Sequence, residues 1–365
     1  LSNDGMTLFT HNFMDRTVTA HDISKIINAR ATEVSQIAVY DLVSNETLPL
    51  DVLNGKQLFY DARDQRLARE QYISCASCHN EGDSDGRVWD FTGVGEGLRN
   101  TITLQGHGGT AQGPLHWSAN FDEVQDFEGQ IRSLAFGTGL LSTIDFNNTI
   151  DPLGTPKAGL SADLDALAAY VNSLTSTPVS PYRPTPATLS TMAQTGKSLF
   201  GTAGCAGCHT APTLTDSSMA ILHDVGTIDT DSGNRLGGTL TGFDTPSVLG
   251  IWKNPPYLPD GSAATIDAAI LAHNTSGSLT PTDITNLVAF IREAEPADIN
   301  DMIDSDNDGL PDLDEVGGFE RDTNGDGRID GEDLDGNGLV DSVDDNFSQA
   351  LLYPVDTDGD GRPDT

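Results

Sequence analysis

Cys75-Ala76-Ser77-Cys78-His79 is the stretch around which this chain is organised, and its pattern recurs as Cys205-Ala206-Gly207-Cys208-His209. Covalent haem attachment needs two thiols a helical turn apart, which form thioethers with the haem vinyl groups, and an adjacent imidazole that ligates the iron. The two motifs use all four cysteines of the chain. The sequence therefore predicts two c-type haem groups, with His79 and His209 as iron ligands.

Two other interpretations of the C-x-x-C pattern are weaker. A zinc site needs matched ligands that a lone C-x-x-C-H does not supply. A redox disulfide has no use for the histidine that follows the second cysteine. Because the whole pattern occurs twice with no cysteine left over, haem attachment is favoured.

Length and charge limit the kinds of partner. The 365 residues are enough for about two to three domains, each with its own core. A formal net charge of −36 would repel a phosphate backbone, so we expect no nucleic acid partner and favour cationic partners or divalent ions. No apolar run approaches the length of a membrane span, so we expect no membrane-spanning segment. No leader pattern opens the chain, so we expect a mature chain or a fragment.

A repeated phrase indicates an internal duplication. Residues 55–59, Gly-Lys-Gln-Leu-Phe, precede the first motif as residues 196–200, Gly-Lys-Ser-Leu-Phe, precede the second. Amphipathic helices are predicted over 161–174, behind a Ser cap, and over 280–291, behind Thr-Pro, each closing one unit. Residues 175–186 are rich in Ser, Thr and Pro and are the expected linker between the units.

Residues 1–24 predict a β-hairpin, because an Asp4-Gly5 turn lies between short alternating apolar segments. The segment resembles the last blade of a YVTN-type β-propeller, whose repeats run from a Ser-x-Asp-Gly turn to a Thr-Val strand. One blade cannot close a propeller, so either further blades precede it or its strands pair elsewhere. An ordinary hairpin on the main body is the alternative.

After Asp298 the composition changes to Asp, Gly and Asn, and the spacing predicts calcium-binding loops. Each EF-hand-like loop has oxygen ligands at positions 1, 3, 5, 9 and 12, a backbone carbonyl at position 7 and Gly at position 6. The expected ligands are Asp304, Asp306, Asp308, Leu310, Asp312, Glu315, Asp322, Asn324, Asp326, Arg328, Asp330, Asp333, Asp335, Asn337, Leu339, Asp341, Asp344, Asp356, Asp358 and Asp360. Without long flanking helices, the loops resemble thrombospondin type 3 or dockerin repeats; a disordered acidic tail is the alternative.

Two haem motifs in this helix order, over residues 50–297, resemble the bacterial di-haem cytochrome c peroxidase and MauG family. The family's Thr-Pro-Ser phrase stands at 245–247, and its Pro-Tyr…Asp-Gly-Ser-Ala-Ala-Thr phrase stands at 256–265. We expect a mainly α fold with two tandem class I cytochrome c-like domains, an N-terminal β-hairpin and irregular C-terminal calcium loops. The expected segments are 1–50 (hairpin and connector), 51–178 (first cytochrome domain), 179–297 (second cytochrome domain) and 298–365 (calcium repeats).

The resemblance also suggests residue roles. Counting along the matched phrase places the distal ligand of the second haem on His273, where peroxidases have Met and MauG has Tyr; a surface histidine is the alternative. Trp117, matching the Trp of the family's Phe-Trp-Asp-Gly phrase, would relay electrons between the haems, although a plain core Trp is the commoner role. A calcium ion between the haems would be held at Asn254, Pro256 and Asn100.

The sixth position of the first haem decides between enzyme and electron carrier. The family's distal Glu phrase, Asn-Pro-x-Glu-Met, is absent here, and Glu128, with Asp126 behind it, is the nearest substitute for proton transfer. Either residue could be an ordinary solvated carboxylate. If His107 or His116 instead ligates the first iron, both haems are six-coordinate and the protein only carries electrons.

These inferences lead to one expected function and one alternative. We expect an oxidoreductase that reacts with hydrogen peroxide at the His79 haem and exchanges electrons with a redox partner protein, as a cytochrome c peroxidase or as a MauG-like oxidase of that partner. The alternative is a non-catalytic cell-surface electron-transfer cytochrome. Because c-type haem is attached outside the cytoplasm, the periplasm or the cell surface of a bacterium is the expected location.

Overall fold

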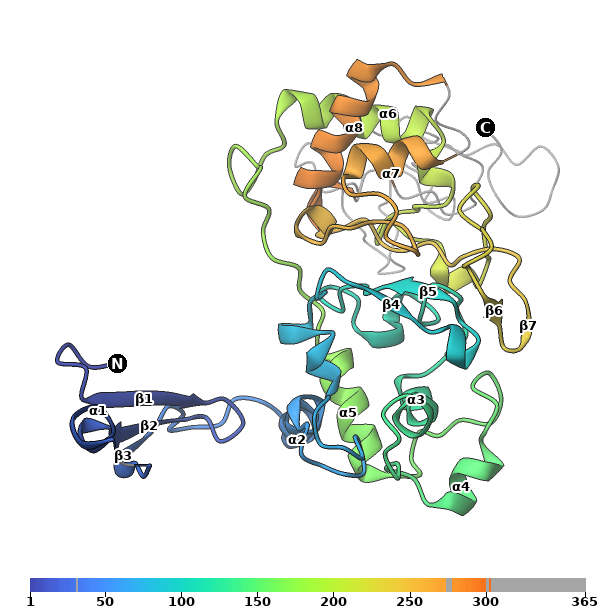
Figure 1. The fold of residues 1–365 in the computed structure, drawn as a ribbon. Helices are drawn as coiled ribbons and strands as arrows, with labels where there is room; N and C mark the ends of the chain where they lie inside the picture. Colours follow the sequence, from blue (N-terminus) through green and yellow to red (C-terminus); the bar gives the residue numbers. More distant parts are fainter. Residues whose placement is uncertain (31, 274–277, 300–301, 303–365) are drawn as a thin grey trace, which may run out of the picture.

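The computed structural model describes residues 1–30, 32–273, 278–299 and 302. The predicted calcium loops lie outside the described residues. Within this part, α-helices combine with a few short strands: a small sheet at the N-terminus projects from a larger helical body (Figure 1). No helix among the described residues is long and apolar enough to cross a membrane.

The N-terminal sheet has three antiparallel strands, β1 (Thr7–Asn12), β2 (Thr17–Asp22) and β3 (Ser35–Asp41), in that order. Helix α1 (Ser24–Ala29) connects β2 to β3. The expected hairpin is present, as β1 and β2.

The Asp4-Gly5 turn is present, with the Gly5 amide donating to the Ser2 carbonyl at 2.9 Å, but the prediction that it joins the two hairpin strands is wrong. The turn precedes β1, where an Asp4 carboxylate oxygen accepts the Met6 amide at 3.0 Å. The pairing of β1 with β2 ends at Asn12 and Thr17, so residues 13–16 form the hairpin turn.

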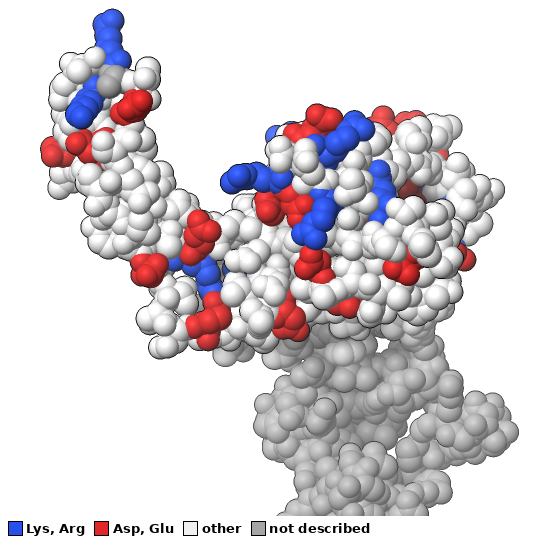
Figure 2. All heavy atoms as spheres, turned by 90° about the horizontal axis from the view of Figure 1, so that it is seen from below, with Lys and Arg blue, Asp and Glu red and all other residues white. Residues whose placement is uncertain are grey.

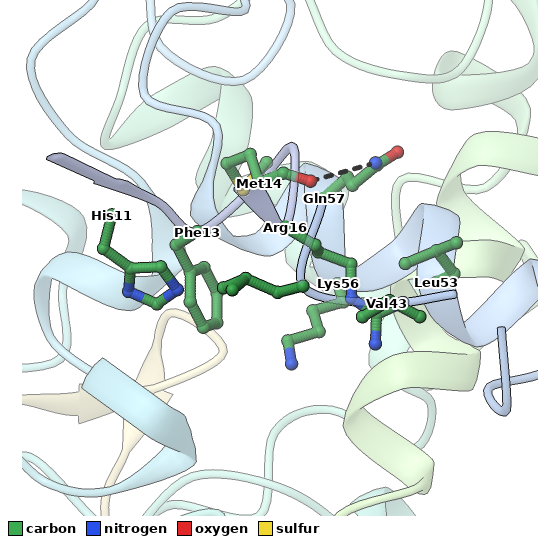
Figure 3. A pocket seen from close by; sticks show the side chains of 9 residues that line it. His11, Phe13, Met14, Arg16, Val43, Leu53, Lys56 and Gln57 are labelled. Carbon is green, nitrogen blue, oxygen red and sulfur yellow. Dashed lines mark hydrogen bonds between the residues drawn. The ribbon is translucent and has the colours of Figure 1, made fainter. Parts of the chain in front are cut away.

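The sheet contacts the body at helix α2 (Leu50–Tyr60). The Phe13 ring lies 4.6 Å from the Tyr60 ring, and the Lys56 ammonium lies 4.8 Å from the centre of the Phe13 ring. A small pocket opens beside this contact, where Gln57 donates a hydrogen bond to the Met14 carbonyl (Figure 3). The hairpin turn thus fastens the sheet to the first helix of the body.

Helices α2 and α5 (Ala162–Asn172) cross where Gly55 lacks a side chain. A Cβ atom on Gly55 would lie 1.7 Å from the Ala166 carbonyl oxygen, so only glycine permits this approach. The predicted Ser cap of α5 is confirmed, because the Ser161 hydroxyl accepts the Leu164 amide at 3.3 Å. The first core consists of Phe59, Val124, Leu141, Leu164, Leu167, Ala168, Tyr170 and Val171.

Helices α6 (Thr191–Thr202) and α8 (Pro281–Glu293) repeat this crossing at Gly196. A Cβ there would lie 2.0 Å from the Asn286 carbonyl oxygen. Thr280 and Pro281 begin α8 as predicted, with the Thr280 hydroxyl accepting the Asp283 amide. The second core consists of Phe200, Leu214, Val248, Leu249, Ile266, Leu287, Val288, Phe290, Ile291, Ala294 and Ile299.

Shorter elements complete the body. The remaining α-helices and strands are α3 (Phe127–Ser133), α4 (Thr143–Asn148), α7 (Ile266–Ala272), β4 (Val88–Asp90), β5 (Leu98–Asn100), β6 (Asn234–Arg235) and β7 (Gly238–Thr239). Single turns of 3-10 helix include η1 (Cys75–Ser77) and η6 (Cys205–Gly207). The expected linker at 175–186 contains no helix or strand.

The two cores meet through backbone contacts. The Asn234 amide donates to Gly95 at 2.7 Å, and the Leu98 amide donates to Asp231 at 3.0 Å. In Figure 1, β4 and β5 face the region of β6 and β7. Close approach of backbone segments is therefore part of the contact between the two cores.

Figure 2 shows basic and acidic side chains interspersed on one face of the body.

The helix crossing can be tested by adding one methyl group. Gly196→Ala should lower the free energy of unfolding by about 1–3 kcal/mol, because the new Cβ overlaps the α8 backbone. Gly201→Ala is the matched control: it lies on the same helix with open space around its Cβ position. The control should be neutral or stabilising by up to about 1 kcal/mol. Equal stability of the two variants in denaturant unfolding would contradict the crossing.

Candidate haem-binding and active site

The first cysteine pair lies on one tight turn, η1. Ser74 and Ser77 cap it reciprocally, and the His79 amide donates to the Cys75 carbonyl at 3.0 Å. Burial raises the pKa of Cys75 and Cys78 to about 11. Both are therefore neutral thiols in the free chain, unlike the thiolate of a reactive redox pair.

His79 is held as a neutral imidazole. Burial lowers its pKa to about 4, and its Nδ1 atom is buried without a hydrogen-bond partner among the described residues. A neutral imidazole is the form that ligates a metal. Because Cys75 also packs against the first core, the thiols and the imidazole fit a covalently attached haem beside that core.

The second motif repeats this arrangement on η6, where the His209 amide donates to the Cys205 carbonyl at 3.0 Å. Burial lowers the pKa of His209 to about 4, and its Nδ1 lies 3.2 Å from the Leu214 carbonyl oxygen. That contact places the ring proton on Nδ1 and leaves Nε2 as the ligand atom. No disulfide joins the cysteines, which are all free thiols.

The structure brings His273 close to His209. His273 caps the C-terminus of α7, and its Nδ1 lies 2.8 Å from the Ala269 carbonyl oxygen. The two rings are near enough that His273 contributes to the low pKa of His209. Both imidazoles therefore anchor Nδ1 on a backbone carbonyl, which designates Nε2 as the atom that each would offer to an iron.

His116 lies near His79 but is held differently. It contributes to the low pKa of His79, so the two rings are within electrostatic reach. Its Nδ1 lies 2.7 Å from the Asn120 side-chain oxygen, and its Nε2 lies 3.4 Å from the Gln130 side-chain nitrogen. Both ring nitrogens of His116 thus face polar side chains.

Asn120 is positioned by the half-buried carboxylate of Glu96. Its side-chain nitrogen donates to Glu96 at 2.6 Å, and Ser118 donates to the other Glu96 oxygen at 2.8 Å. Arg99 pairs with the same carboxylate at 3.3 Å. This chain of contacts fixes the orientation of Asn120, which in turn fixes the His116 ring.

The oxygens of Glu128 and Asp126 already have structural partners. Glu128 is fully buried and accepts hydrogen bonds from Arg132 and from the amides of Leu140 and Leu141. Asp126 forms a buried ion pair with the Lys157 ammonium at 2.5 Å. The geometry therefore favours His116 over both carboxylates for proton transfer.

His107 shows less connection to the first motif. It is deeply buried, and burial alone lowers its pKa to about 4. Its amide bonds to the Leu104 carbonyl at 3.3 Å. Between the two histidines expected near the first haem, His116 is the one whose charge reaches His79.

Trp117 lies where the two cores meet. Its indole nitrogen donates to the Asn100 carbonyl at 2.8 Å, and its ring meets the Phe243 ring edge-on with centroids 6.4 Å apart. The Trp117 carbonyl accepts the Asp244 amide at 2.7 Å. The residue thus contacts both halves of the body, as a relay would.

The residues expected around a calcium ion converge in part. The Asn100 side-chain nitrogen lies 2.6 Å from the Pro256 carbonyl oxygen, while the Asn100 side-chain oxygen is buried without a hydrogen-bond partner among the described residues. Asn254 donates instead to Asp83 at 2.6 Å, beside the Lys253 ammonium. Asn100 and Pro256 are therefore neighbours, and Asn254 lies on Asp83.

Several polar residues near the motifs carried no sequence signal. Gln130, Asn120 and Glu96 surround His116, and a second group surrounds Cys208: His223, Asp216, Ser217 and Asp244. Their partners are far apart in the sequence or lie on irregular loops, so no periodic pattern marks them. Only the folded chain reveals these groups.

Comparisons with known proteins agree with this chemistry. A family model described as cytochrome c matches residues 193–295. Over 308 residues the chain is 28% identical to the methylamine utilization protein MauG of Methylorubrum extorquens, covering 70% of this chain and 82% of that protein. The chain is an oxidoreductase. It is also 25% identical over 279 residues to the cytochrome c551 peroxidase of Pseudomonas aeruginosa, covering 65% of this chain and 76% of that protein.

The chain is thus similar to MauG and to a cytochrome c peroxidase, and the match to cytochrome c supports covalent haem c as its cofactor. Among solved structures, a chain of the hydrazine synthase of Kuenenia stuttgartiensis matches with a TM-score of 0.47 and 22% identity, covering 68% of this chain and 89% of that chain.

Proposed function

We propose that this oxidoreductase reacts with hydrogen peroxide at the haem of Cys75, Cys78 and His79, and stores electrons at the haem of Cys205, Cys208 and His209. The two helix crossings and the two cores support two tandem cytochrome c domains, at 51–178 and 179–297. His209 and His273 would both ligate the second iron.

The observation that carries this proposal is the difference between His116 and His273. His273 anchors Nδ1 on a backbone carbonyl, whereas His116 has polar side chains at both ring nitrogens. A ring held at both nitrogens is better suited to handling a proton than to ligating iron. We therefore assign His116 to proton handling and not to ligation of the first iron.

When bound, the first haem would supply the iron that binds and polarises peroxide. Cleavage of the O–O bond also requires a proton to move from the inner to the outer oxygen. His116 is the group in this chain best placed to move it, since burial favours its neutral form and Asn120 orients the ring. Gln130 contributes an amide on the other side of the ring.

Electron exchange between the two halves would pass through Trp117. Its contacts with Asn100 on one side and with Phe243 and Asp244 on the other support this role. A redox partner protein would supply the electrons in the peroxidase version, or would itself be oxidised in the MauG-like version. We propose a periplasmic or cell-surface location, because c-type haem is attached outside the cytoplasm.

Electron paramagnetic resonance of the oxidised, haem-loaded protein tests the proposal. We expect one high-spin and one low-spin haem, with peroxide turnover. In His273→Ala the low-spin signal should disappear, because the second iron loses one of its two imidazoles. Two low-spin signals without peroxide turnover would instead establish the electron carrier, and an unchanged low-spin signal in the variant would exclude His273 as ligand.

His116→Gln tests the proton-handling role. The rate of reaction with peroxide should fall about 10²–10⁴-fold, because a glutamine cannot accept and return the proton. The high-spin signal should persist, since His116 is not proposed as a ligand. His11→Gln, on strand β1, is the control and should react at the wild-type rate. A change of spin state in His116→Gln would show that His116 ligates the first iron.

We also propose a calcium ion between the haems, held by the Asn100 side-chain oxygen and the Pro256 carbonyl, with Asn254 nearby. Calcium at 100 times its dissociation constant should add about 2.7 kcal/mol of stability, which is several degrees in melting temperature. Asn100→Ala should lose this shift when melting is followed by haem absorbance. An equal calcium response in the variant and the wild type would place the ion elsewhere.

A further inference from the structure

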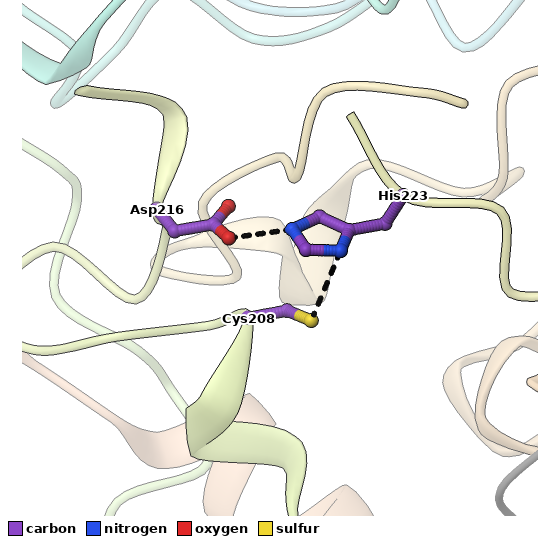
Figure 4. A group of neighbouring side chains, drawn as sticks. All are labelled: Cys208, Asp216 and His223. Carbon is purple, nitrogen blue, oxygen red and sulfur yellow. Dashed lines mark hydrogen bonds and ion pairs between the residues drawn. The ribbon is translucent and has the colours of Figure 1, made fainter. Parts of the chain in front are cut away.

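His223 lies between Cys208, a cysteine of the second haem-attachment motif, and the buried carboxylate of Asp216. Its Nδ1 lies 3.7 Å from the Cys208 sulfur, and its Nε2 lies 2.6 Å from an Asp216 oxygen (Figure 4). The His223 side chain is 28% exposed and that of Asp216 is 3% exposed. The pair thus connects solvent to the immediate surroundings of Cys208.

Cys208, His223 and Asp216 begin a row of polar groups, which continues from Asp216 toward Trp117. The neighbouring Ser217 donates its hydroxyl to Asp244 at 2.7 Å, and the Asp244 amide donates to the Trp117 carbonyl at 2.7 Å. One row of hydrogen-bonding groups therefore extends from the Cys208 sulfur to the residue between the two cores.

The backbone holds this row rigidly. The amides and carbonyls of His223 and Phe243 exchange two hydrogen bonds of 2.8 Å, as an isolated antiparallel bridge. The chain approaches so closely that a Cβ on Gly242 would lie 2.7 Å from the His223 amide nitrogen. His223 and Asp244 are thus fixed on adjacent segments.

The row has more carboxylates than cations. Asp216 and Asp244 are both more than nine-tenths buried, and each has an oxygen with no hydrogen-bond partner in the described part of the chain. The charges that act on Asp244 are those of Asp216 and His223. Arg99 lies over the Phe243 ring, but its ion pair is with Glu96.

Burial sets the protonation of this row. Burial raises the pKa of Asp244 to about 7; Ser217 opposes the shift, and Asp216 adds to it. Asp244, beside the carboxylate of Asp216, is therefore the group of this row that favours its protonated form. A change of one elementary charge on a neighbouring group alters the affinity of this row for a proton.

A metal ion is a poor fit for this row in the haem-loaded protein. Cys208, Asp216 and His223 each offer one ligand atom, all within 4.8 Å of one another. The Cys208 sulfur would be a thioether once haem is attached, which removes the thiolate that such a site needs. The remaining groups are an acid and a base.

We propose that His223, Asp216 and Asp244 form a proton-accepting site coupled to reduction of the haem at Cys205–His209. One electron from a one-electron donor reduces that haem, and one proton from solvent enters through His223 and binds the row; both leave on oxidation. Reduction removes one positive charge beside the row, which raises its affinity for a proton. The proposal rests on the second haem of the proposed function and not on peroxide chemistry.

Spectroelectrochemical titration of the haem-loaded protein, at pH values from about 5 to about 9, tests the coupling. The potential of the low-spin haem should fall as pH rises, up to a tenfold change in the redox equilibrium per pH unit, which is about 59 mV for one electron. His223→Gln and Asp244→Asn should flatten this dependence. Asp224→Asn, an exposed neighbour of His223, should leave it unchanged.

Ser217→Ala gives a second, independent readout. Since the Ser217 hydroxyl lowers the pKa of Asp244, its loss should move the pH-dependent range of the potential upward. A flat potential in the wild type, or an equal slope in His223→Gln and Asp244→Asn, would overturn the coupling even where peroxide turnover is intact. If peroxide turnover fails while the potential still depends on pH, the proposed function is wrong and the coupling stands.

Discussion

The close crossing of two helix pairs is the constraint on which the rest of the body depends. At Gly55 and at Gly196 the helices touch backbone to backbone, and no other residue leaves room for the opposing carbonyl. Phe59 and Phe200 follow each glycine by one helical turn and are almost completely buried. Because η1 and η6 contact α2 and α6, the crossing also determines where each cysteine pair lies.

Each haem motif has a further histidine nearby, and the structure holds these two histidines, His273 and His116, in different ways. His273 lies at the end of a helix, where its own backbone fixes Nδ1 and leaves the other nitrogen to a metal. His116 lies in a loop with φ of 71°, in the left-handed region, and a side-chain network holds it. Strained backbone of this kind persists only where surrounding contacts enforce it, and it is common at functional sites. The repeat thus supplies the haem sites, while the loops supply their difference.

Local signals in the sequence predicted what local chemistry determines. The C-x-x-C-H motifs, the Ser161 cap and the Thr280-Pro281 helix start depend on neighbours within a few residues, and the structure has them where expected. The hairpin turn was misplaced because Asp4-Gly5 is a good turn sequence in itself; strand pairing, a longer-range interaction, decided against it.

Long-range contacts account for what the sequence did not show. Glu128 looked like a free acid in the sequence, yet Leu140 and Leu141 donate to it from the following loop. The Asp244 partner of Ser217 is 27 residues away. No spacing rule relates residues that are brought together by loops of irregular conformation.

Because Trp117 lies between the two cores, electron exchange through it would change the charge beside the row of His223, Asp216 and Asp244. Electrons moving between the cores change the charge on either side of a contact whose cations are already engaged: Arg99 pairs with Glu96, Lys253 pairs with Asp83, and Arg235 donates to the Ser118 and Ala119 carbonyls. A buried region of low dielectric cannot absorb such a change by reorienting water, so the charge must be compensated locally. On the first side Lys157 and Arg132 already neutralise Asp126 and Glu128. On the second side, within the described residues, the imidazole of His223 is the counterpart of Asp216 and Asp244, and proton exchange there is the compensation that we propose.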